Sequence, residues 1–168
     1  YSGLRIRGVD ASRINVTING VPVNDPESHD VYWVNMPDLV GSIENMQVQR
    51  GVGSSTNGAA AFGASVNIKT NDLRAQPAAR IDFSGGSFGT LRGTLQASTG
   101  LLNNRFSLDA RLSEIRSGGY LDRASADLRS LALTATYLTP KSIWKAVVLN
   151  GAERTYQAWY GTPESRYR

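Results

Sequence analysis

Residues 90–98 read TLRGTLQAS and residues 105–113 read RFSLDARLS. Apolar and polar side chains alternate in both stretches, which is typical of β-strands because successive side chains of a strand point to opposite sides. Leu91 falls on the apolar face, whereas Arg92 and Arg111 fall on the polar face. The sequence therefore predicts two neighbouring antiparallel strands with one apolar face and one face that carries charges.

The same alternation extends over most of the second half of the chain. Five segments sort their side chains to two faces: 79–84, 90–98, 105–113, 130–137 and, less regularly, 143–154. Their connections alternate short, long and short, with a long polar one predicted over 116–128, and the strands approach the ~9–11 residues of a tilted transmembrane strand. Charged and amide side chains at Arg92, Gln96, Asp109 and Arg111 suit a wide lumen that holds water or a polar plug.

Five strands are too few to close around such a lumen, so we expect this chain to be a fragment whose further strands follow Arg168. Aromatic residues sit where interfacial girdles would need them, with Tyr137 and Trp144 at one end and Tyr156, Trp159 and Tyr160 at the other. A soluble β-sandwich that binds a ligand is the alternative, because its strands alternate in the same way. That alternative predicts that residues 78–168 dissolve and stay folded without detergent.

Composition argues against several other classes of protein. The 168 residues include no cysteine and one histidine, His29, so disulfides, thiolate metal sites and histidine-based catalytic triads have no basis here. The net charge is +4, but the basic residues are scattered singly along the strand segments, which disfavours nucleic-acid binding. We expect no enzyme activity, no cofactor and no bound metal.

The first half of the chain contains shorter elements. Residues 14–18 alternate as a strand and meet Asn19-Gly20, a strong hairpin signal because both turn positions favour positive φ. Val21–Val23 would return as a short partner, since Pro22 lacks a donor N–H. A polar loop over 24–32, a brief helical turn over 38–43, an extended stretch over 45–49, a strand over 65–70 and a linker over 71–77 are expected to follow.

Several ordered motifs in this half resemble the plug of TonB-dependent outer-membrane receptors. They are Ile6-Arg7-Gly8, Asn19-Gly20-Val21-Pro22, Gln49-Arg50-Gly51 and Gly63-Ala64-Ser65-Val66-Asn67-Ile68, and the resemblance covers residues 4–70. The loop sequences at 23–39 and 153–164 resemble those of receptors from Bacteroidetes-type bacteria. The chain departs from the family at Gln47, where a glutamate is common, and at Asn57, where a tyrosine is common.

The resemblance implies an all-β dominated architecture. Residues 1–75 would be the C-terminal part of an α+β plug domain, and residues 76–168 would be the first ~5 antiparallel strands of a transmembrane β-barrel of about 22 strands. It implies a place in the outer membrane and energy-coupled import of a scarce nutrient through plug movement. A ferric siderophore or haem comes first as the nutrient, followed by an oligosaccharide, a peptide or cobalamin. The implied partners are TonB with its inner-membrane energising complex, the nutrient, outer-membrane lipid and, as a further candidate, a surface lipoprotein, with no nucleic acid.

Candidate site residues follow from their position in the plug and in the outer loops. Ligand contacts are expected at the outward-facing tips of the plug: Asp10, Ser12, Asn24, Asp25, Glu27, His29, Asp30, Tyr32, Trp33 and Asn57. Plug-to-barrel contacts are expected at Arg7 and Arg50, and outer-loop aromatics at Tyr120, Tyr156, Trp159 and Tyr160. The alternatives are that the loop residues pack only against barrel loops, that the aromatics only anchor at the bilayer surface, and that the carboxylates near His29 bind calcium.

Overall fold

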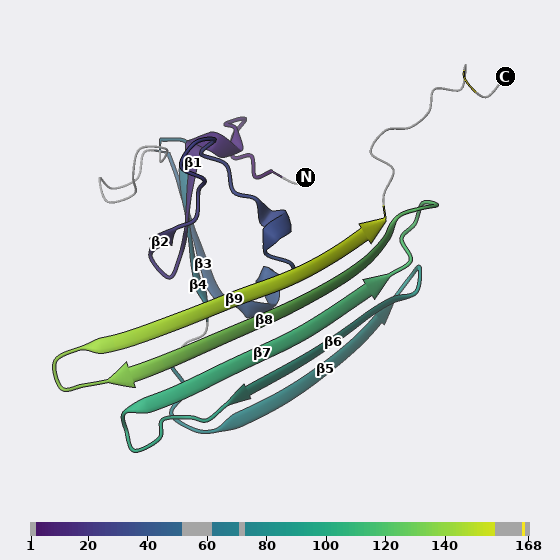
Figure 1. Ribbon diagram of the computed structural model, residues 1–168. Coiled ribbons are helices and arrows are strands. Elements are labelled where there is room, and N and C mark those ends of the chain that lie inside the picture. Colours follow the sequence, from purple (N-terminus) through teal and green to yellow (C-terminus); the bar gives the residue numbers. More distant parts are fainter. Residues whose placement is uncertain (1–2, 52–61, 71–72, 157–165, 167–168) are drawn as a thin grey trace.

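Two β-sheets form the structure, a computed structural model that describes residues 3–51, 62–70, 73–156 and 166 (Figure 1). The N-terminal unit, residues 3–70, holds a four-stranded sheet of order β2-β1-β4-β3. The C-terminal sheet has five strands in the order β5-β6-β7-β8-β9. None of the helices among the described residues has the length and hydropathy needed to cross a membrane.

The sheet of the N-terminal unit is mixed. Its strands are β1 (Ile14–Ile18), β2 (Val21–Pro22), β3 (Ile43–Arg50) and β4 (Ala64–Thr70), and its 3-10 helices are η1 (Ala11–Arg13), η2 (Trp33–Asn35) and η3 (Leu39–Ser42). β1 runs parallel to β4 and antiparallel to β2, and β3 runs antiparallel to β4. The predicted strands, the hairpin and the helical turn near residue 40 are thereby confirmed.

The β1–β2 hairpin shows why its turn residues matter. Asn19 and Gly20 have φ of 52° and 84°, the left-handed values that the turn predicts. The Asn19 side chain also accepts from the Thr70 backbone N–H at 3.0 Å and donates to Thr70 Oγ1 at 2.7 Å. The hairpin is therefore fixed to the end of β4 as well as to its own strands.

A small apolar core holds the N-terminal unit together. Its buried members are Ile14, Val16, Ile18, Leu39, Ala64, Val66 and Ile68. They come from alternate positions of β1 and β4 and from η3, as expected where one sheet face is covered by the loops that return over it. Trp33 and Met36 pack against this core and so fix the segment that carries η2 and η3.

The C-terminal sheet is an antiparallel meander, and all of its strands except β6 extend beyond the predicted ranges. Its strands are β5 (Ala78–Gly86), β6 (Thr90–Ser98), β7 (Phe106–Ser117), β8 (Ser125–Leu138) and β9 (Ile143–Tyr156). The connection expected over 116–128 is shorter than predicted and covers residues 118–124, because the β7–β8 ladder continues until Ser117 pairs with Ala126. Arg116 and Asp127, both inside the expected connection, pair across the strands at 3.9 Å, so polar residues extend the ladder where a loop is expected.

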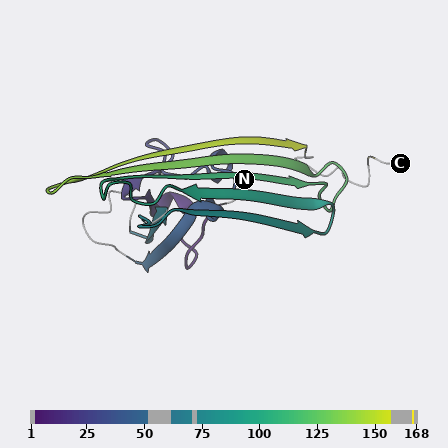
Figure 2. The same cartoon turned by 90° about the horizontal axis from the view of Figure 1, so that it is seen from below.

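The two faces of the C-terminal sheet differ in the way the alternation predicts. The inner face buries polar side chains, namely Thr94, Ser107, Asp109, Arg111, Ser113, Thr134 and Thr136. The outer face exposes apolar ones, among them Ile81, Phe83, Leu91, Leu95, Leu108 and Leu112. The N-terminal unit lies against the polar face, while no second sheet among the described residues covers the apolar face (Figures 1 and 2). This arrangement contradicts a sandwich packed through the leucines.

Candidate functional site

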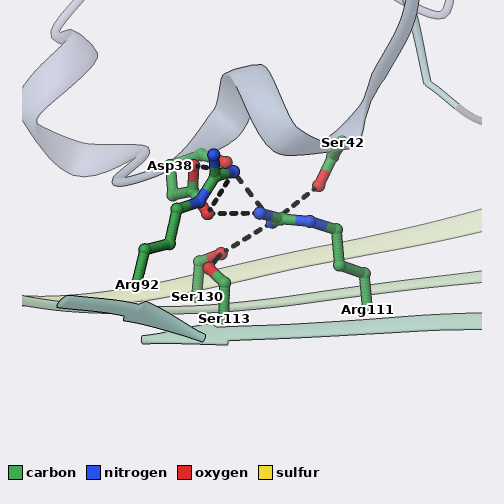
Figure 3. Close-up of polar contacts among 6 residues, drawn as sticks. All are labelled: Asp38, Ser42, Arg92, Arg111, Ser113 and Ser130. Atoms are coloured by element: carbon green, nitrogen blue, oxygen red, sulfur yellow. Dashed lines mark hydrogen bonds and ion pairs between the residues drawn. The ribbon is translucent and has the colours of Figure 1, made fainter. Parts of the chain in front are cut away.

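Asp38 occupies the short turn between η2 and η3, where the N-terminal unit meets the C-terminal sheet. Its φ is 51°, in the left-handed region, and the next residue, Leu39, is buried in the apolar core. Because Leu39 anchors the turn to the core, the carboxylate of Asp38 is carried to the other side, toward β6 and β7 (Figure 3).

Two arginines of the C-terminal sheet hold this carboxylate (Figure 3). Arg92 of β6 donates from Nη2 to Asp38 Oδ1 at 3.0 Å, and Arg111 of β7 pairs through its Nη2 with Oδ2. Arg92 Nη2 also lies 3.4 Å from Oδ2, so both guanidinium groups reach the carboxylate. Charge-assisted hydrogen bonds of this kind are about twice as strong as neutral ones.

Arg111 also binds the backbone and the hydroxyls around the aspartate. Its Nη1 donates to the Asp38 carbonyl oxygen at 3.3 Å and to the Oγ atoms of Ser42 and Ser130, each at 3.2 Å. The hydroxyls of Ser113 and Ser130 lie 3.0 Å apart and complete the cluster. One guanidinium thus bridges η3, β7 and β8.

Burial sets the energetics of this cluster. The side chains of Asp38 and Arg111 are 7% and 1% exposed, whereas that of Arg92 is 40% exposed. Burial by itself raises the pKa of Asp38, but hydrogen bonds from Ser113 and Arg111 and the charges of Arg111 and Arg92 outweigh it, so its pKa lies below the ordinary value. The aspartate is therefore ionised at neutral pH and compensates the charge of Arg111, which would be costly to bury alone.

Two glycines allow the close approach of the turn to the sheet. A Cβ atom at Gly41 would overlap the guanidinium of Arg111, and a Cβ atom at Gly151 of β9 would overlap the ring of Pro37. A further contact lies at the end of β4, where Lys145 of β9 donates from Nζ to the Thr70 carbonyl oxygen at 3.3 Å. The contact between the N-terminal unit and the C-terminal sheet therefore consists of ion pairs and hydrogen bonds, together with tight packing at the two glycines.

The predicted ligand loop, residues 24–32, is folded around its own polar side chains. Asn24 accepts from the Val16 backbone N–H at 2.7 Å and donates to the carbonyl oxygens of Ile14 and His29 at 2.9 and 2.8 Å. Asp25 accepts from the backbone N–H of Ser28 at 2.8 Å, and hydrogen bonds from the Ser28 backbone and hydroxyl keep its pKa below the ordinary value. These two side chains serve to shape the loop.

The other predicted ligand residues lie in different settings. Glu27, His29 and Tyr32 are exposed on this loop, Asp30 and Ser12 are partly buried, and Asp10 forms an exposed ion pair with Arg5 at 3.3 Å. Trp33 packs against the core of the N-terminal unit. Asn57 lies outside the described residues. The structure thus gathers Glu27, His29 and Tyr32 on one loop, while Trp33 is partly buried against the core.

Arg7 and Arg50, predicted to touch the barrel, are both exposed. Among the described residues, the ion pairs that cross to the C-terminal sheet are made by Asp38. Of the predicted outer aromatics, Tyr120 is exposed and meets Phe88 edge to face at 5.2 Å, Tyr156 is exposed at the end of β9, and Trp159 and Tyr160 lie outside the described residues. The role of these four aromatics as an outer-loop group stays a prediction.

Asp38 is not among the candidate site residues that the sequence suggests, and the sequence points to it only indirectly. Mid-strand arginines at 92 and 111 on the polar face of the sheet require a negative partner where they are buried. The first 70 residues offer six carboxylates, at Asp10, Asp25, Glu27, Asp30, Asp38 and Glu44. Periodicity gives no reason to choose among them, because the choice depends on how the two parts dock.

The contact between the N-terminal unit and the C-terminal sheet is suited to reversible non-covalent binding of the two parts. Among the described residues, no group of three or more histidine, cysteine, aspartate or glutamate side chains is arranged to hold a metal ion. The cluster consists of charges and hydroxyls that join two parts of the chain. Many of its contacts can be replaced by water, so such a contact separates at lower cost than an apolar core does.

Comparison with protein families finds one family model that matches the N-terminal part of the chain. Residues 1–65 match the family model described as the TonB-dependent Receptor Plug Domain. No curated protein matches the chain. Several solved structures share its fold, and their likeness extends over both the N-terminal unit and the C-terminal sheet.

Three of these structures illustrate the likeness. The ferripyoverdine receptor of the outer membrane of Pseudomonas aeruginosa is 15% identical, with a TM-score of 0.72 over 88% of this chain and 19% of that one. The copper transporter OprC is 17% identical, with a TM-score of 0.68 over 92% of this chain and 26% of that one. The ferric citrate transporter FecA is 20% identical, with a TM-score of 0.66 over 89% of this chain and 24% of that one. The chain thus spans about a fifth to a quarter of the length of these proteins. The plug-domain match and the shared fold together support the family of TonB-dependent receptors.

Proposed function

We propose that this chain forms the later part of the plug and the first strands of the barrel of a TonB-dependent receptor, which imports a scarce nutrient across the outer membrane. The plug would occupy residues 1–75 and the barrel strands residues 76–168. The observation that carries the proposal is the opposite character of the two faces of the C-terminal sheet, since the polar face holds the N-terminal unit while the apolar face is exposed. A barrel in lipid needs this arrangement.

Location in the outer membrane has two kinds of support. The exposed leucines, isoleucine and phenylalanine of the outer face suit a hydrocarbon environment, and the backbone of β6, β7 and β8 is paired on both edges. Among the proteins of similar fold, the ferripyoverdine receptor is a receptor of the outer membrane. From the loop sequences at 23–39 and 153–164 we further propose that the receptor is of the Bacteroidetes type.

Import would work by releasing the plug from the wall of the barrel. In this proposal TonB and its inner-membrane complex supply the energy, and the contact centred on Asp38 is what that energy must loosen. Ionic and hydrogen-bonded contacts suit the task, because water can replace them as the plug moves. No chemical change of the nutrient is involved.

The nutrient is proposed to be a ferric siderophore or haem, with an oligosaccharide, a peptide or cobalamin as further candidates. Support for a metal chelate comes from the proteins of similar fold, which include a ferripyoverdine receptor, a ferric citrate transporter and a copper transporter. Contacts with the nutrient are proposed for the exposed Glu27, His29 and Tyr32 of the plug loop. A surface lipoprotein is retained as a candidate partner.

A reversible tether between plug and barrel tests the proposal. These 168 residues contain no cysteine, so Asp38→Cys with Arg111→Cys introduces two thiols into this part of the receptor for a short bifunctional thiol reagent with a cleavable disulfide. We expect the tethered receptor to bind its nutrient at the outer surface but to transport none, and reduction to restore transport. The matched control joins two strands of the C-terminal sheet away from the cluster, Ala78→Cys with Ser98→Cys, which pair directly and should leave transport intact. Normal uptake with the plug tethered would overturn the proposal.

A further inference from the structure

The outer face of the C-terminal sheet carries a compact group of charges near one end of β7, β8 and β9. Its members are Glu114, Arg116, Asp127, Arg129 and Arg154, which we call the outer charge cluster. They share the face of Leu112 and Leu131, from which they are separated by even numbers of residues along each strand. This cluster has no part in the contact with the plug, which lies on the opposite face.

Ion pairs connect most of the cluster. Glu114 accepts from Arg116 at 2.6 Å and from Arg129 at 3.1 Å, and Asp127 lies 3.4 Å from Arg129. Arg154 stands opposite Asp127 in the β8–β9 ladder. Three guanidinium groups against two carboxylates leave one positive charge in excess. The cluster as a whole therefore attracts an anion.

The height of the cluster matches a membrane boundary. Phe106 marks the opposite end of the apolar face on β7, and Glu114 comes eight residues later. At ~3.4 Å per residue this is roughly 27 Å along the strand, and a tilt of about 40° shortens it to roughly 21 Å. The apolar band of a membrane barrel is about 25 Å tall, so the charges lie where hydrocarbon gives way to head groups.

A shallow groove of about 710 Å³ runs from the cluster into the apolar face. Phe83, Leu95, Leu112 and Leu131 line its apolar part, while Glu114, Arg116 and Arg129 line its polar part. Gly93 opens the floor, because a Cβ atom there would lie only 3.3 Å from the ring of Phe83. The groove therefore combines space for an acyl chain with guanidinium groups at one end.

We propose that the outer charge cluster and this groove bind a phosphorylated lipid of the outer leaflet, an inference that rests on the proposed outer-membrane location and on the expected place of Tyr120 and Tyr156 in outer loops. Arginine pairs with phosphate through two parallel hydrogen bonds, which gives both strength and orientation. Basic groups at the head-group level are a recurrent means of binding specific lipids. Glu114 and Asp127 hold the guanidinium groups in place, and the acyl chain lies along Leu112 and Leu131.

Lipid binding by the purified receptor tests this proposal. The receptor in mild detergent is mixed with diphosphoryl lipid A, and the bound lipid is counted by native mass spectrometry. We expect the combined variant Arg116→Gln, Arg129→Gln and Arg154→Gln to bind lipid A roughly tenfold more weakly, because several charge-assisted hydrogen bonds are lost. The control is Arg80→Gln, which removes an ion-paired arginine from the opposite face of the same sheet and should bind as the parent does.

Three results would overturn the assignment: undiminished binding of lipid A by the combined variant, an equal loss in the Arg80→Gln control, and equally strong binding of phosphatidylglycerol by the parent receptor. The last would indicate a general preference for anionic lipid. Nutrient uptake is measured in the same variants and should stay unchanged. Failure of the transport proposal would appear as absent uptake in the parent receptor, so the two failures can be told apart.

Discussion

Arg111 on β7 and Asp38 on the plug turn form an ion pair in which 1% of the arginine side chain and 7% of the aspartate side chain are exposed. They are separated by 73 positions in the chain, and Arg92 is the second cation on the same carboxylate. Neither part of the molecule satisfies these charges alone. The pair therefore makes the position of the plug depend on the barrel wall.

Replacing Asp38 by alanine should release the plug turn. Arg111 would remain buried without its counter-charge, and breaking a buried pair in this way costs about 3–5 kcal/mol. We expect the plug to unfold at lower urea concentration and its backbone amides to exchange faster, while the barrel strands stay folded. Hydrogen exchange measured by mass spectrometry resolves the two parts, and unchanged exchange over residues 33–43 would contradict the prediction.

Replacing both partners should cost less than replacing one. In the variant Asp38→Leu with Arg111→Met no unpaired charge is left in the interface, and apolar replacements of buried ion pairs are often neutral or stabilising. The urea midpoint of the double variant should therefore exceed that of Asp38→Ala. Arg80→Gln provides the control, since it breaks an exposed ion pair with Asp82 that solvent screens.

Acid should loosen the plug through Asp38, which lies outside the membrane-spanning strands. Its pKa in the folded protein is below the ordinary value of 3.8, because the arginines and Ser113 favour the ionised form over the cost of burial. Ionised Asp38 therefore contributes its full stabilisation of the folded plug above about pH 3.8. This contribution is lost as the pH falls through the lower pKa that Asp38 has in the folded state. In the parent protein, the backbone amides of the plug turn should exchange faster below that pH, as measured by hydrogen exchange. The variant Asp38→Asn should lack this part of the decline, and identical pH profiles would refute the role of Asp38.

Gly151→Ala should displace the plug turn from β9. The added methyl group would overlap the ring of Pro37, which is rigid and has little freedom to move aside. Overpacking of this kind costs about 1–3 kcal/mol. We expect a lower urea midpoint for the plug. Gly86→Ala serves as control because its added Cβ would meet Thr90 at an ordinary 3.6 Å, and equal effects at both positions would exclude the steric explanation.

A charge on the outer face should impair membrane insertion. Leu95 is exposed on the apolar face of β6, and arginine at mid-bilayer depth on a lipid-facing position costs about 2–4 kcal/mol. Leu95→Arg should reduce the amount of folded receptor recovered from outer membranes, as judged by heat-modifiable gel mobility. Ser84→Arg on the inner face of β5 should be tolerated. Equal recovery of the two variants would favour a soluble domain.

Alternation in the sequence was sufficient to predict most strands of both sheets, because it reflects the two environments on either side of a strand, but it did not predict the parallel pairing of β1 with β4. β6 begins and ends where the pattern predicts, and the Asn19-Gly20 turn adopts the backbone angles that its residues favour. The predicted loop over 116–128 is shorter in the structure because the charged residues at its ends, Arg116 and Asp127, pair across the ladder. Polar composition alone does not distinguish a loop from a strand end that carries ion pairs.

The sequence by itself determined which faces of the strands are apolar and where the hairpin turns, since these depend on neighbours one to four positions away. The tertiary structure alone decided that Asp38, among six carboxylates in the first 70 residues, meets Arg92 and Arg111. That choice depends on the docking of the plug against the barrel wall, and docking is set by Leu39 in the core and by the close approach at Gly41 and Gly151. Contacts between residues so far apart in the chain leave no periodic trace, because each partner satisfies its local pattern equally well without the other.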